Sequence, residues 1–359
     1  MTDEGRLERA VERVLGRVPG VALAVVGPAG VRISRAAGFA DLARRTAASP
    51  AMVCPWFSMT KIVTATVAMR AAEQGALDLD APVHPWVPAM RHLTPVENAR
   101  RITPRHLLAH TAGLVNPLPL AWIHPAAEPG PDPARFLDGL LARHGRLQGA
   151  PGGRSRYSNL GTLVLGEALA AVHRMPYVDL VRHAVLEPLA LSHTDFVYRP
   201  DMLEHAAVGY HARFDPMRLL LPRWVQGPAT GRWMSLRRCL LDGSAYGGLV
   251  GSLDDVARFL RLHLNDGELD GVRLVSSQGA ATMRVIASPG DRFDLGLGWF
   301  RPANRRGVAP AFVEHLGGGA GFYNVMRLYP DRGIGIAIMG NATSYDLDAL
   351  ADLAPEIGS

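Results

Sequence analysis

The sequence has few cysteines, no long apolar run and no block of charge of one sign. Its 359 residues include only two cysteines, Cys54 and Cys239, which are too few for a disulfide framework and are expected to be reduced thiols. No apolar stretch approaches the roughly 20 residues that a membrane-spanning helix needs. The formal charge of +5 comes from arginines spread along the chain, which disfavours a nucleic-acid partner. We expect a globular protein with neither a membrane nor a nucleic-acid partner.

No secretion signal is recognisable in the first residues, because no continuous apolar stretch follows a basic start. Instead, apolar residues repeat at helical spacing among acidic and basic ones: Leu7, Val11, Val14, Leu15 and Val18. We therefore expect an amphipathic N-terminal helix and a cytoplasmic protein.

Common catalytic and cofactor motifs are also missing. The sequence has no Gly-x-Ser-x-Gly elbow, no phosphate-binding loop and no dinucleotide fingerprint. His106 and His110 are four residues apart and could in principle share a metal, but no acidic partner follows in the zincin pattern. We expect neither a metal ion nor a cofactor.

A serine and a lysine three residues apart, Ser58 and Lys61, stand where a polar linker gives way to a helical pattern over 62–72. At this spacing both side chains share one face of a helix. A lysine shielded from water can lose its proton near neutral pH and help to activate a serine hydroxyl. Alone, the pattern more often describes a helix cap followed by a solvated lysine. Cys54 lies four residues earlier, but no motif supports it as a nucleophile, and we expect a buried thiol.

Two further motifs change this interpretation. Tyr157-Ser158-Asn159 precedes an apolar helical pattern, and His315-Leu316-Gly317-Gly318 follows an apolar run near the C-terminus. The three motifs in this order resemble the serine β-lactamase and penicillin-binding protein superfamily. The resemblance is strongest to the class C β-lactamase branch, which also holds family VIII carboxylesterases, D-aminopeptidases, acyltransferases and peptide-cyclising thioesterases. Four further segments carry it: 75–88 (GALDLDAPVHPWVP), 102–114 (ITPRHLLAHTAGL), 247–260 (GGLVGSLDDVARFL) and 296–300 (GLGWF).

The resemblance implies an α+β, β-lactamase-like fold, in which an antiparallel sheet formed from both chain ends is flanked by helices. We expect residues 1–57 and 290–359 to form the sheet region and residues 58–289 a mainly helical region. The active site should lie between them in a single catalytic unit. Local patterns predict strands over 21–26, 31–37, 295–301, 311–315, 322–329 and 333–339, and helices over 62–72, 133–144, 160–172, 177–186, 253–264 and 346–353, with Thr103 capping another.

The resemblance also assigns roles to the motif residues. Ser58 is the expected nucleophile, and Lys61 and Tyr157 form the expected proton-handling pair, with the first base left open between them. An ammonium on Lys61 would favour the phenolate of Tyr157. Asn159 would hold Lys61 or the substrate. The backbone N–H groups of Ser58 and Gly318 would form an oxyanion hole, and Gly317 would let the strand approach the substrate closely.

His315 departs from the β-lactamase pattern, which has a lysine at this place. Because a histidine is mostly neutral at pH 7, selection of anionic substrates should be weaker. We therefore expect a serine hydrolase that forms an acyl-enzyme on Ser58, most simply a carboxylesterase on small or medium acyl esters. The alternatives are an acyl or peptidyl transferase or cyclising enzyme of secondary metabolism, a β-lactamase or D-amino-acid peptidase or amidase, and a non-catalytic binding protein on the same fold.

Two irregular segments, 115–133 and 210–246, are long enough to be functional loops. By their position in the family they would border the active-site cleft, although ordinary loop packing explains them equally well. The expected partner is a small ester or amide. The acyl group, the acceptor and the oligomeric state are left open by the sequence.

Overall fold

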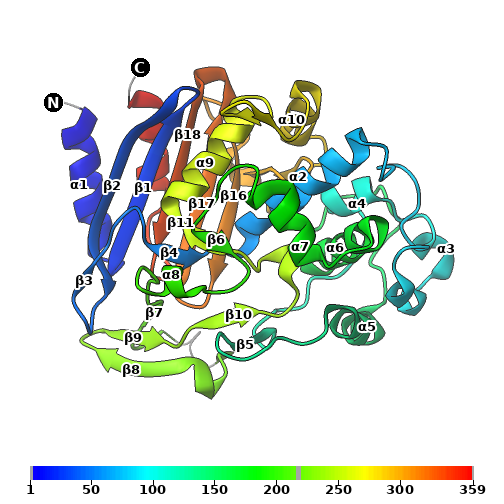
Figure 1. Cartoon of the computed structure of the whole chain (residues 1–359), viewed down its shortest axis with the longest axis horizontal. Helices are drawn as coiled ribbons and strands as arrows, with labels where there is room; N and C mark the ends of the chain where they lie inside the picture. Colours follow the sequence, from blue (N-terminus) through cyan, green and yellow to red (C-terminus); the bar gives the residue numbers. More distant parts are fainter. Residues whose placement is uncertain (1–2, 216–219, 358–359) are drawn as a thin grey trace.

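The computed structural model describes residues 3–215 and 220–357. Its largest element is an eight-stranded antiparallel sheet to which both chain ends contribute (Figure 1). The N-terminal strand β1 (Gly20–Gly27) pairs directly with the C-terminal strand β18 (Ile334–Gly340). The spatial order is β14 (Phe293–Leu295), β15 (Phe300–Pro302), β16 (Val313–Gly319), β17 (Phe322–Tyr329), β18, β1, β2 (Gly30–Asp41) and β3 (Thr46–Ala47).

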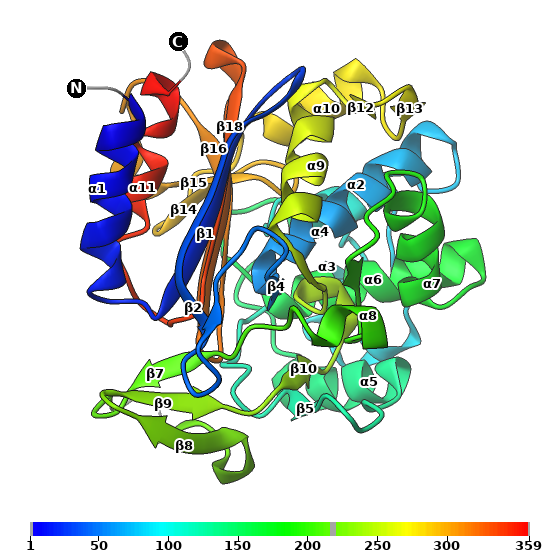
Figure 2. The same ribbon diagram turned by 60° about the vertical axis from the view of Figure 1, so that its left-hand side comes forward.

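Helices cover both faces of this sheet (Figure 2). On one face lie the amphipathic helix α1 (Asp3–Leu15) and α11 (Asp348–Ala351), and on the other lie α2 (Thr60–Glu73) and α9 (Leu253–Leu264). The side chains of a strand point alternately to the two faces of its sheet. Because helices cover both faces, all the side chains of β1 can be apolar. Val21, Leu23 and Val25 pack on the α1 side, whereas Ala22 and Ala24 pack on the α2 side. None of the described helices is long and apolar enough to cross a membrane.

The chain between α2 and α9 forms further short helices beside the sheet, on the α2 side. Thr103 caps α4 and Ser158 caps α6 through side-chain hydrogen bonds to the first turn, as serine and threonine commonly do. These helices and the later α10 have the following bounds: α3 (Val96–Ala99), α4 (Pro104–Leu108), α5 (Pro133–His144), α6 (Asn159–His173), α7 (Tyr177–Val181), α8 (Pro200–Leu203) and α10 (Ser277–Arg284).

Small sheets form outside the main sheet, and two of them, β4-β11-β6 and β5-β10, join segments far apart in the sequence. The central strand of the first is β11 (Val250–Ser252), which lies between β4 (Val53–Pro55) and β6 (Thr194–Asp195). The others are β5 (Ile123–Pro125) with β10 (Cys239–Leu241), β12 (Glu268–Leu269) with β13 (Val272–Arg273), and β9 (Trp233–Leu236) between β7 (Tyr210–Ala212) and β8 (Gln226–Thr230).

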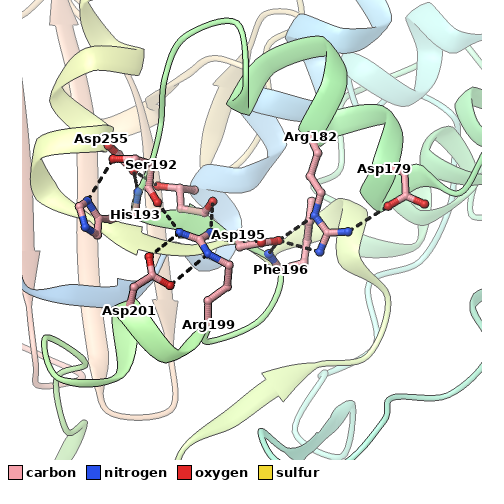
Figure 3. Close-up of polar contacts among 10 residues, drawn as sticks. Asp179, Arg182, Ser192, His193, Asp195, Phe196, Arg199, Asp201 and Asp255 are labelled. Atoms are coloured by element: carbon pink, nitrogen blue, oxygen red, sulfur yellow. Dashed lines mark hydrogen bonds and ion pairs between the residues drawn. The ribbon is translucent and has the colours of Figure 1, made fainter.

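Buried carboxylates hold β6 in place (Figure 3). Asp195 accepts hydrogen bonds from the guanidinium groups of Arg182 and Arg199, at 2.8 and 3.2 Å. Asp255, in the first turn of α9, accepts from the Thr194 hydroxyl and from a backbone N–H, each at 2.8 Å. Since β6 pairs with β11 and β11 with β4, this network supports the strand that leads into Ser58.

Several element predictions are confirmed: the helices over 133–144 and 253–264, the strand over 322–329 and the N-terminal hairpin. The single strand predicted over 295–301 is wrong, because Gly298 has a φ of +96° and the chain turns between β14 and β15. In the segment predicted to be irregular, 210–246, the described residues 210–215 and 220–246 instead contain four short strands. The predicted last helix is shorter, and α11 is followed by a 3₁₀ turn at Ala354–Glu356.

Candidate active site

Ser58 lies in a 3₁₀ turn, η1 (Phe57–Met59), between β4 and α2. The prediction that the serine begins the helix therefore needs correction, since α2 itself begins at Thr60. Lys61 follows in the first turn of α2, and residues three apart on a helical backbone lie on the same side. Lys61 Nζ lies within 3.1 Å of Ser58 Oγ. The preceding Phe57 has a φ of +48°, a conformation that a non-glycine residue adopts only when its surroundings hold it there.

Lys61 is buried, with 3% of its surface exposed, and its amine contacts three oxygen atoms. Nζ lies 2.8 Å from Asn159 Oδ1, 2.7 Å from the backbone carbonyl of Tyr246 and 3.1 Å from Ser58 Oγ. Burial holds the pKa of Lys61 well below its ordinary value. The three acceptors are all uncharged, so they do not offset the cost of burying an ammonium.

These contacts fix the direction of the Lys61 lone pair. The Asn159 and Tyr246 carbonyl oxygens can only accept hydrogen bonds, so Lys61 must donate an N–H to each. The Ser58 contact can run in either direction, because a hydroxyl both donates and accepts. As an ammonium, Lys61 donates to all three oxygens. As a free amine, it keeps two donations and directs its lone pair at the Ser58 hydroxyl.

Lys61 is also the only lysine among the 359 residues. The other 37 basic residues of the combined lysine and arginine count of 38 are therefore arginines. An arginine cannot serve as a base at neutral pH, because its guanidinium stays protonated. The presence of a single lysine is therefore a further sequence signal, independent of motif spacing, that points to Lys61 as the base.

Tyr157 completes the group around Ser58, to which its side chain is hydrogen-bonded. Burial raises the pKa of Tyr157 above its ordinary value, and the Ser58 hydrogen bond opposes this only in part. Lys61 Nζ lies 4.9 Å from the centre of the Tyr157 ring. The expected phenolate is therefore not favoured, because the amine that was to stabilise it is itself driven toward its neutral form.

His110 is a structural partner of this site rather than a ligand of a metal. Its ring stacks on Tyr157 with centroids 4.7 Å apart, and its Nδ1 accepts from the Ser158 backbone N–H at 3.0 Å. Burial lowers the pKa of His110 to about 3, so the ring is neutral with its proton on Nε2. His106 belongs to the cap of α4. Within 3–215 and 220–357, no three His, Cys, Asp or Glu residues could jointly hold a metal ion.

Asn159 occupies the first position of α6, directly after its Ser158 cap. Its side-chain carbonyl holds Lys61, and its backbone N–H donates to Asn116 Oδ1 at 2.9 Å. The Ser158 hydroxyl donates to the Val115 carbonyl. The Tyr-Ser-Asn turn is thus bonded to the segment that starts at Val115. Sequence reasoning missed the parts played by His110, Asn116 and Tyr246, because each acts through backbone atoms or across long separations.

The glycines of β16 let this strand press against the turn that carries Ser58. A Cβ on Gly317 would lie 2.2 Å from the Trp56 carbonyl oxygen, and one on Gly319 would lie 2.5 Å from the Phe57 ring. Gly318 faces the other way, where a Cβ would meet only the Tyr323 ring at 3.4 Å. From the sequence, Gly317 was expected to let the strand approach the substrate. In the structure it instead lets the strand approach the backbone of Trp56.

His315 is 1% exposed and packs edge-on against Phe300, with ring centroids 4.7 Å apart. Its Nδ1–H donates to the Leu316 carbonyl at 2.8 Å, which leaves Nε2 without a proton when the ring is neutral. Burial, with a smaller contribution from Lys61, places the pKa of His315 well below its ordinary value. Position 315 thus carries no positive charge near neutral pH.

Cys54 lies in β4 and is fully buried, and burial raises the pKa of its thiol. Both cysteines are free, as expected. A thiol that resists ionisation is a poor nucleophile. Ser58 therefore remains the better candidate of the two.

A cavity of about 110 Å³ opens beside Ser58. Among the described residues that line it none is charged, and most are apolar. Both irregular segments, 115–133 and 210–246, contribute to it. Larger hollows of about 380 and 280 Å³ lie elsewhere and contain none of the motif residues. The lining consists of Phe57, Ser58, Pro119, Leu120, Ile123, Asn159, Leu221, Leu241, Tyr246, Gly318, Gly319 and Ala320.

The chain belongs to the β-lactamase family, whose model, described as Beta-lactamase, matches residues 7–356. Among curated relatives, the D-alanyl-D-alanine-carboxypeptidase/endopeptidase AmpH of Escherichia coli (strain K12) is 26% identical over 290 residues. That match covers 79% of this chain and 69% of the relative. The protein is thus a member of the β-lactamase and penicillin-binding protein superfamily of serine hydrolases.

Solved structures agree with the fold. The D-amino acid amidase from Ochrobactrum anthropi SV3 superposes with a TM-score of 0.82 at 21% identity, covering 99% of this chain and 98% of that one. EstCE1, described as a hydrolase with promiscuous acyltransferase activity, superposes with a TM-score of 0.77 at 22% identity and the same coverage. The predicted β-lactamase-like α+β fold is confirmed.

Proposed function

We propose that the protein hydrolyses neutral carboxylic esters with small or medium acyl groups through an acyl-enzyme on Ser58. The observation that carries this proposal is the position of the Lys61 amine. It is buried, contacts no carboxylate among the described residues and is held 3.1 Å from the serine hydroxyl. In this proposal Lys61, as a free amine, takes the Ser58 proton while Oγ attacks the ester carbonyl. The first base, which the sequence leaves open, is then Lys61.

Tyr157 serves in this scheme as a neutral acid. When the tetrahedral intermediate collapses, the phenol gives its proton to the departing alkoxide, and the Lys61 ammonium returns a proton to the phenolate. Burial, which raises the pKa of Tyr157, keeps the phenol protonated until this step. Ser58 and Gly318 both line the cavity, and their backbone N–H groups are the proposed oxyanion donors. Water then attacks the acyl-enzyme by the same route in reverse.

Two features favour neutral esters over β-lactams or D-amino-acid peptides. The described lining of the cavity has no cation to pair with a substrate carboxylate, and His315 stays neutral. Transfer of the acyl group to an alcohol or amine is the second candidate function. The apolar lining favours it, since water is held poorly there and an organic acceptor is held well. The structural neighbour EstCE1 combines both kinds of activity in its description.

Mass spectrometry of the acyl-enzyme tests this proposal. The protein is mixed with p-nitrophenyl butyrate, quenched in acid and digested with trypsin, which releases residues 46–61 with both Ser58 and Lys61. We expect a butyryl group on this peptide that hydroxylamine removes, because esters are cleaved and amides are not. Ser58→Ala should abolish both the adduct and ester turnover.

Two results would contradict the proposal. A hydroxylamine-resistant adduct on residues 46–70, the peptide that remains because trypsin does not cleave after an acylated lysine, would place the acyl group on the Lys61 amine. Unchanged ester turnover in Ser58→Ala would show that another group is the nucleophile. A comparison of two substrates completes the test. We expect kcat/KM to be higher for p-nitrophenyl butyrate, a neutral ester, than for a cephalosporin.

A further inference from the structure

Two strongly exposed leucines adjoin the cavity beside Ser58. Leu118 is 76% exposed and Leu220 is 55% exposed. Leu118 immediately precedes the lining residues Pro119 and Leu120, and Leu220 immediately precedes the lining residue Leu221. Each of these two segments therefore has an exposed leucine directly beside a residue of the cavity wall. Exposed apolar surface that is contiguous with a pocket can mark a ligand-binding site.

The cavity walls beside both leucines are anchored to the protein. In the first segment, Trp122 packs edge-on against Tyr246, with ring centroids 5.9 Å apart. In the second, the Leu221 carbonyl accepts from the Gln226 side chain at 3.3 Å. The pairing of β5 with β10 joins the two segments, because Ile123 lies opposite Leu241 and both line the cavity.

The cavity is small for the acyl groups that its apolar lining suits. Its volume of about 110 Å³ is below that of the roughly 150 Å³ apolar cavity that binds benzene in an engineered protein. An acyl chain of a few carbons would fill it. A longer chain must extend beyond the cavity. Leu118 and Leu220 are strongly exposed apolar residues that directly precede lining residues in the sequence.

We propose that Leu118 and Leu220 form an apolar ledge that binds the outer carbons of the acyl chain, so that the preferred substrates are esters of medium-length fatty acids. This inference rests on the proposed function. The ledge serves the acyl group rather than the alcohol, because the cavity is lined by Ser58 and Gly318 but not by the proton donor Tyr157. The alcohol must leave beside Tyr157, whereas the acyl chain stays bonded to Ser58.

The ledge is tested with a chain-length series. Initial rates are measured with p-nitrophenyl acetate, butyrate and octanoate below their micelle concentrations, which keeps the leaving group constant. In the wild type, kcat/KM should rise from acetate to butyrate and again from butyrate to octanoate. In Leu118→Ser/Leu220→Ser, the octanoate-to-acetate ratio of kcat/KM should fall about tenfold, because outer methylenes lose their apolar contact. Acetate turnover should be unchanged.

Leu203→Ser is the matched control, since Leu203 is a 41% exposed leucine at the end of α8 and does not line the cavity. Its ratio should equal that of the wild type. An unchanged ratio in the double variant, with normal acetate turnover, would overturn the ledge and leave the proposed function standing.

A second readout does not require turnover. Methyl and octyl phosphonofluoridates form one covalent bond to a nucleophilic serine, with loss of fluoride, and their rates of labelling Ser58 can be compared by intact mass. The octyl reagent should react faster with the wild type but not with the double variant. If no ester were hydrolysed, the proposed function would fail, but the labelling experiment would still test the ledge. The ledge would be overturned if the octyl-to-methyl ratio of labelling rates were the same in the wild type and the double variant.

Discussion

At the scale of single residues, Lys61, Ser58 and Tyr157 lie together as the proposed proton-transfer unit. Lys61 Nζ contacts Ser58 Oγ at 3.1 Å, Tyr157 is hydrogen-bonded to the same serine, and the amine lies 4.9 Å from the Tyr157 ring. In the proposed mechanism each group passes a proton to the next. Removing either partner therefore interrupts the same transfer.

We predict that Tyr157→Phe and Lys61→Met each lower kcat for p-nitrophenyl butyrate by about 10²- to 10⁴-fold, the usual range for a general acid or base. The double variant should lose far less than the product of the two losses, because groups acting as one unit fail together. Tyr177→Phe is the matched control, since its half-buried hydroxyl bonds Thr64 at 2.7 Å and not Ser58. Multiplicative losses in the double variant would argue against a shared proton path.

The sequence predicted which residues meet at this site but not their protonation states. The motif order in the resemblance pointed to Ser58, Lys61, Tyr157 and Asn159, and the structure brings all four together. The prediction of a phenolate on Tyr157 was wrong, because it assumed an ammonium on Lys61. The pKa of Lys61 depends on burial, which motif spacing does not reveal. The roles themselves remain predictions until the acyl-enzyme is measured.

At the scale of elements, the position of Ser58 depends on the contact between β16 and the turn η1. Gly317 faces the Trp56 carbonyl and Gly319 faces the Phe57 ring, so the strand backbone lies directly against the turn. Asn324, opposite Gly317 on β17, adds a hydrogen bond of 2.8 Å to the Pro55 carbonyl. The turn is therefore fixed from the sheet side.

We predict that Gly317→Ala lowers the melting temperature by several degrees and lowers kcat by at least tenfold, because its Cβ would lie 2.2 Å from a backbone oxygen and the turn must shift. Gly30→Ala, in β2, is the matched control. A Cβ there would meet nothing within 4 Å and the residue does not line the cavity, so stability and ester turnover should change little. Equal effects of the two substitutions, measured by thermal unfolding and kinetics, would show that this packing does not position Ser58.

Elements were predicted well where pattern and capping agreed, as in α5 and α9. Prediction failed where strands are short and paired across long separations. The strands β7 to β10 contain only three to five residues each, and their partners lie in other segments or behind irregular turns. Their stability comes from pairing and packing rather than from a local pattern.

At the scale of the whole molecule, the fold buries a single lysine beside a serine. The sheet unites both chain ends (Figure 1). The segments beside it bring Tyr157, Asn159 and Tyr246 to Lys61. The Asp195 network supports β6 and, through β11, the strand before Ser58 (Figure 3). Because burial alone lowers the pKa of Lys61, this property belongs to the assembled fold and would be lost on unfolding.

The sign of the pH dependence follows from this burial. Above its lowered pKa, Lys61 is a free amine and can accept the Ser58 proton. As the pH falls through that pKa, the amine is protonated, its lone pair is lost and turnover must fall. The acid limb of kcat/KM for the ester should therefore report Lys61, with no contribution from a charge change at His315, whose pKa lies well below its ordinary value.

Nuclear magnetic resonance of the protein labelled with ¹³C at lysine Cε tests this account most directly. Lys61 is the only lysine, so the labelled spectrum contains one lysine signal and its titration needs no assignment. We predict a midpoint far below the ordinary value of about 10.4 that coincides with the acid limb of kcat/KM. A midpoint near the ordinary value would mean that Lys61 is an ammonium at neutral pH, and it would contradict its role as the base that activates Ser58.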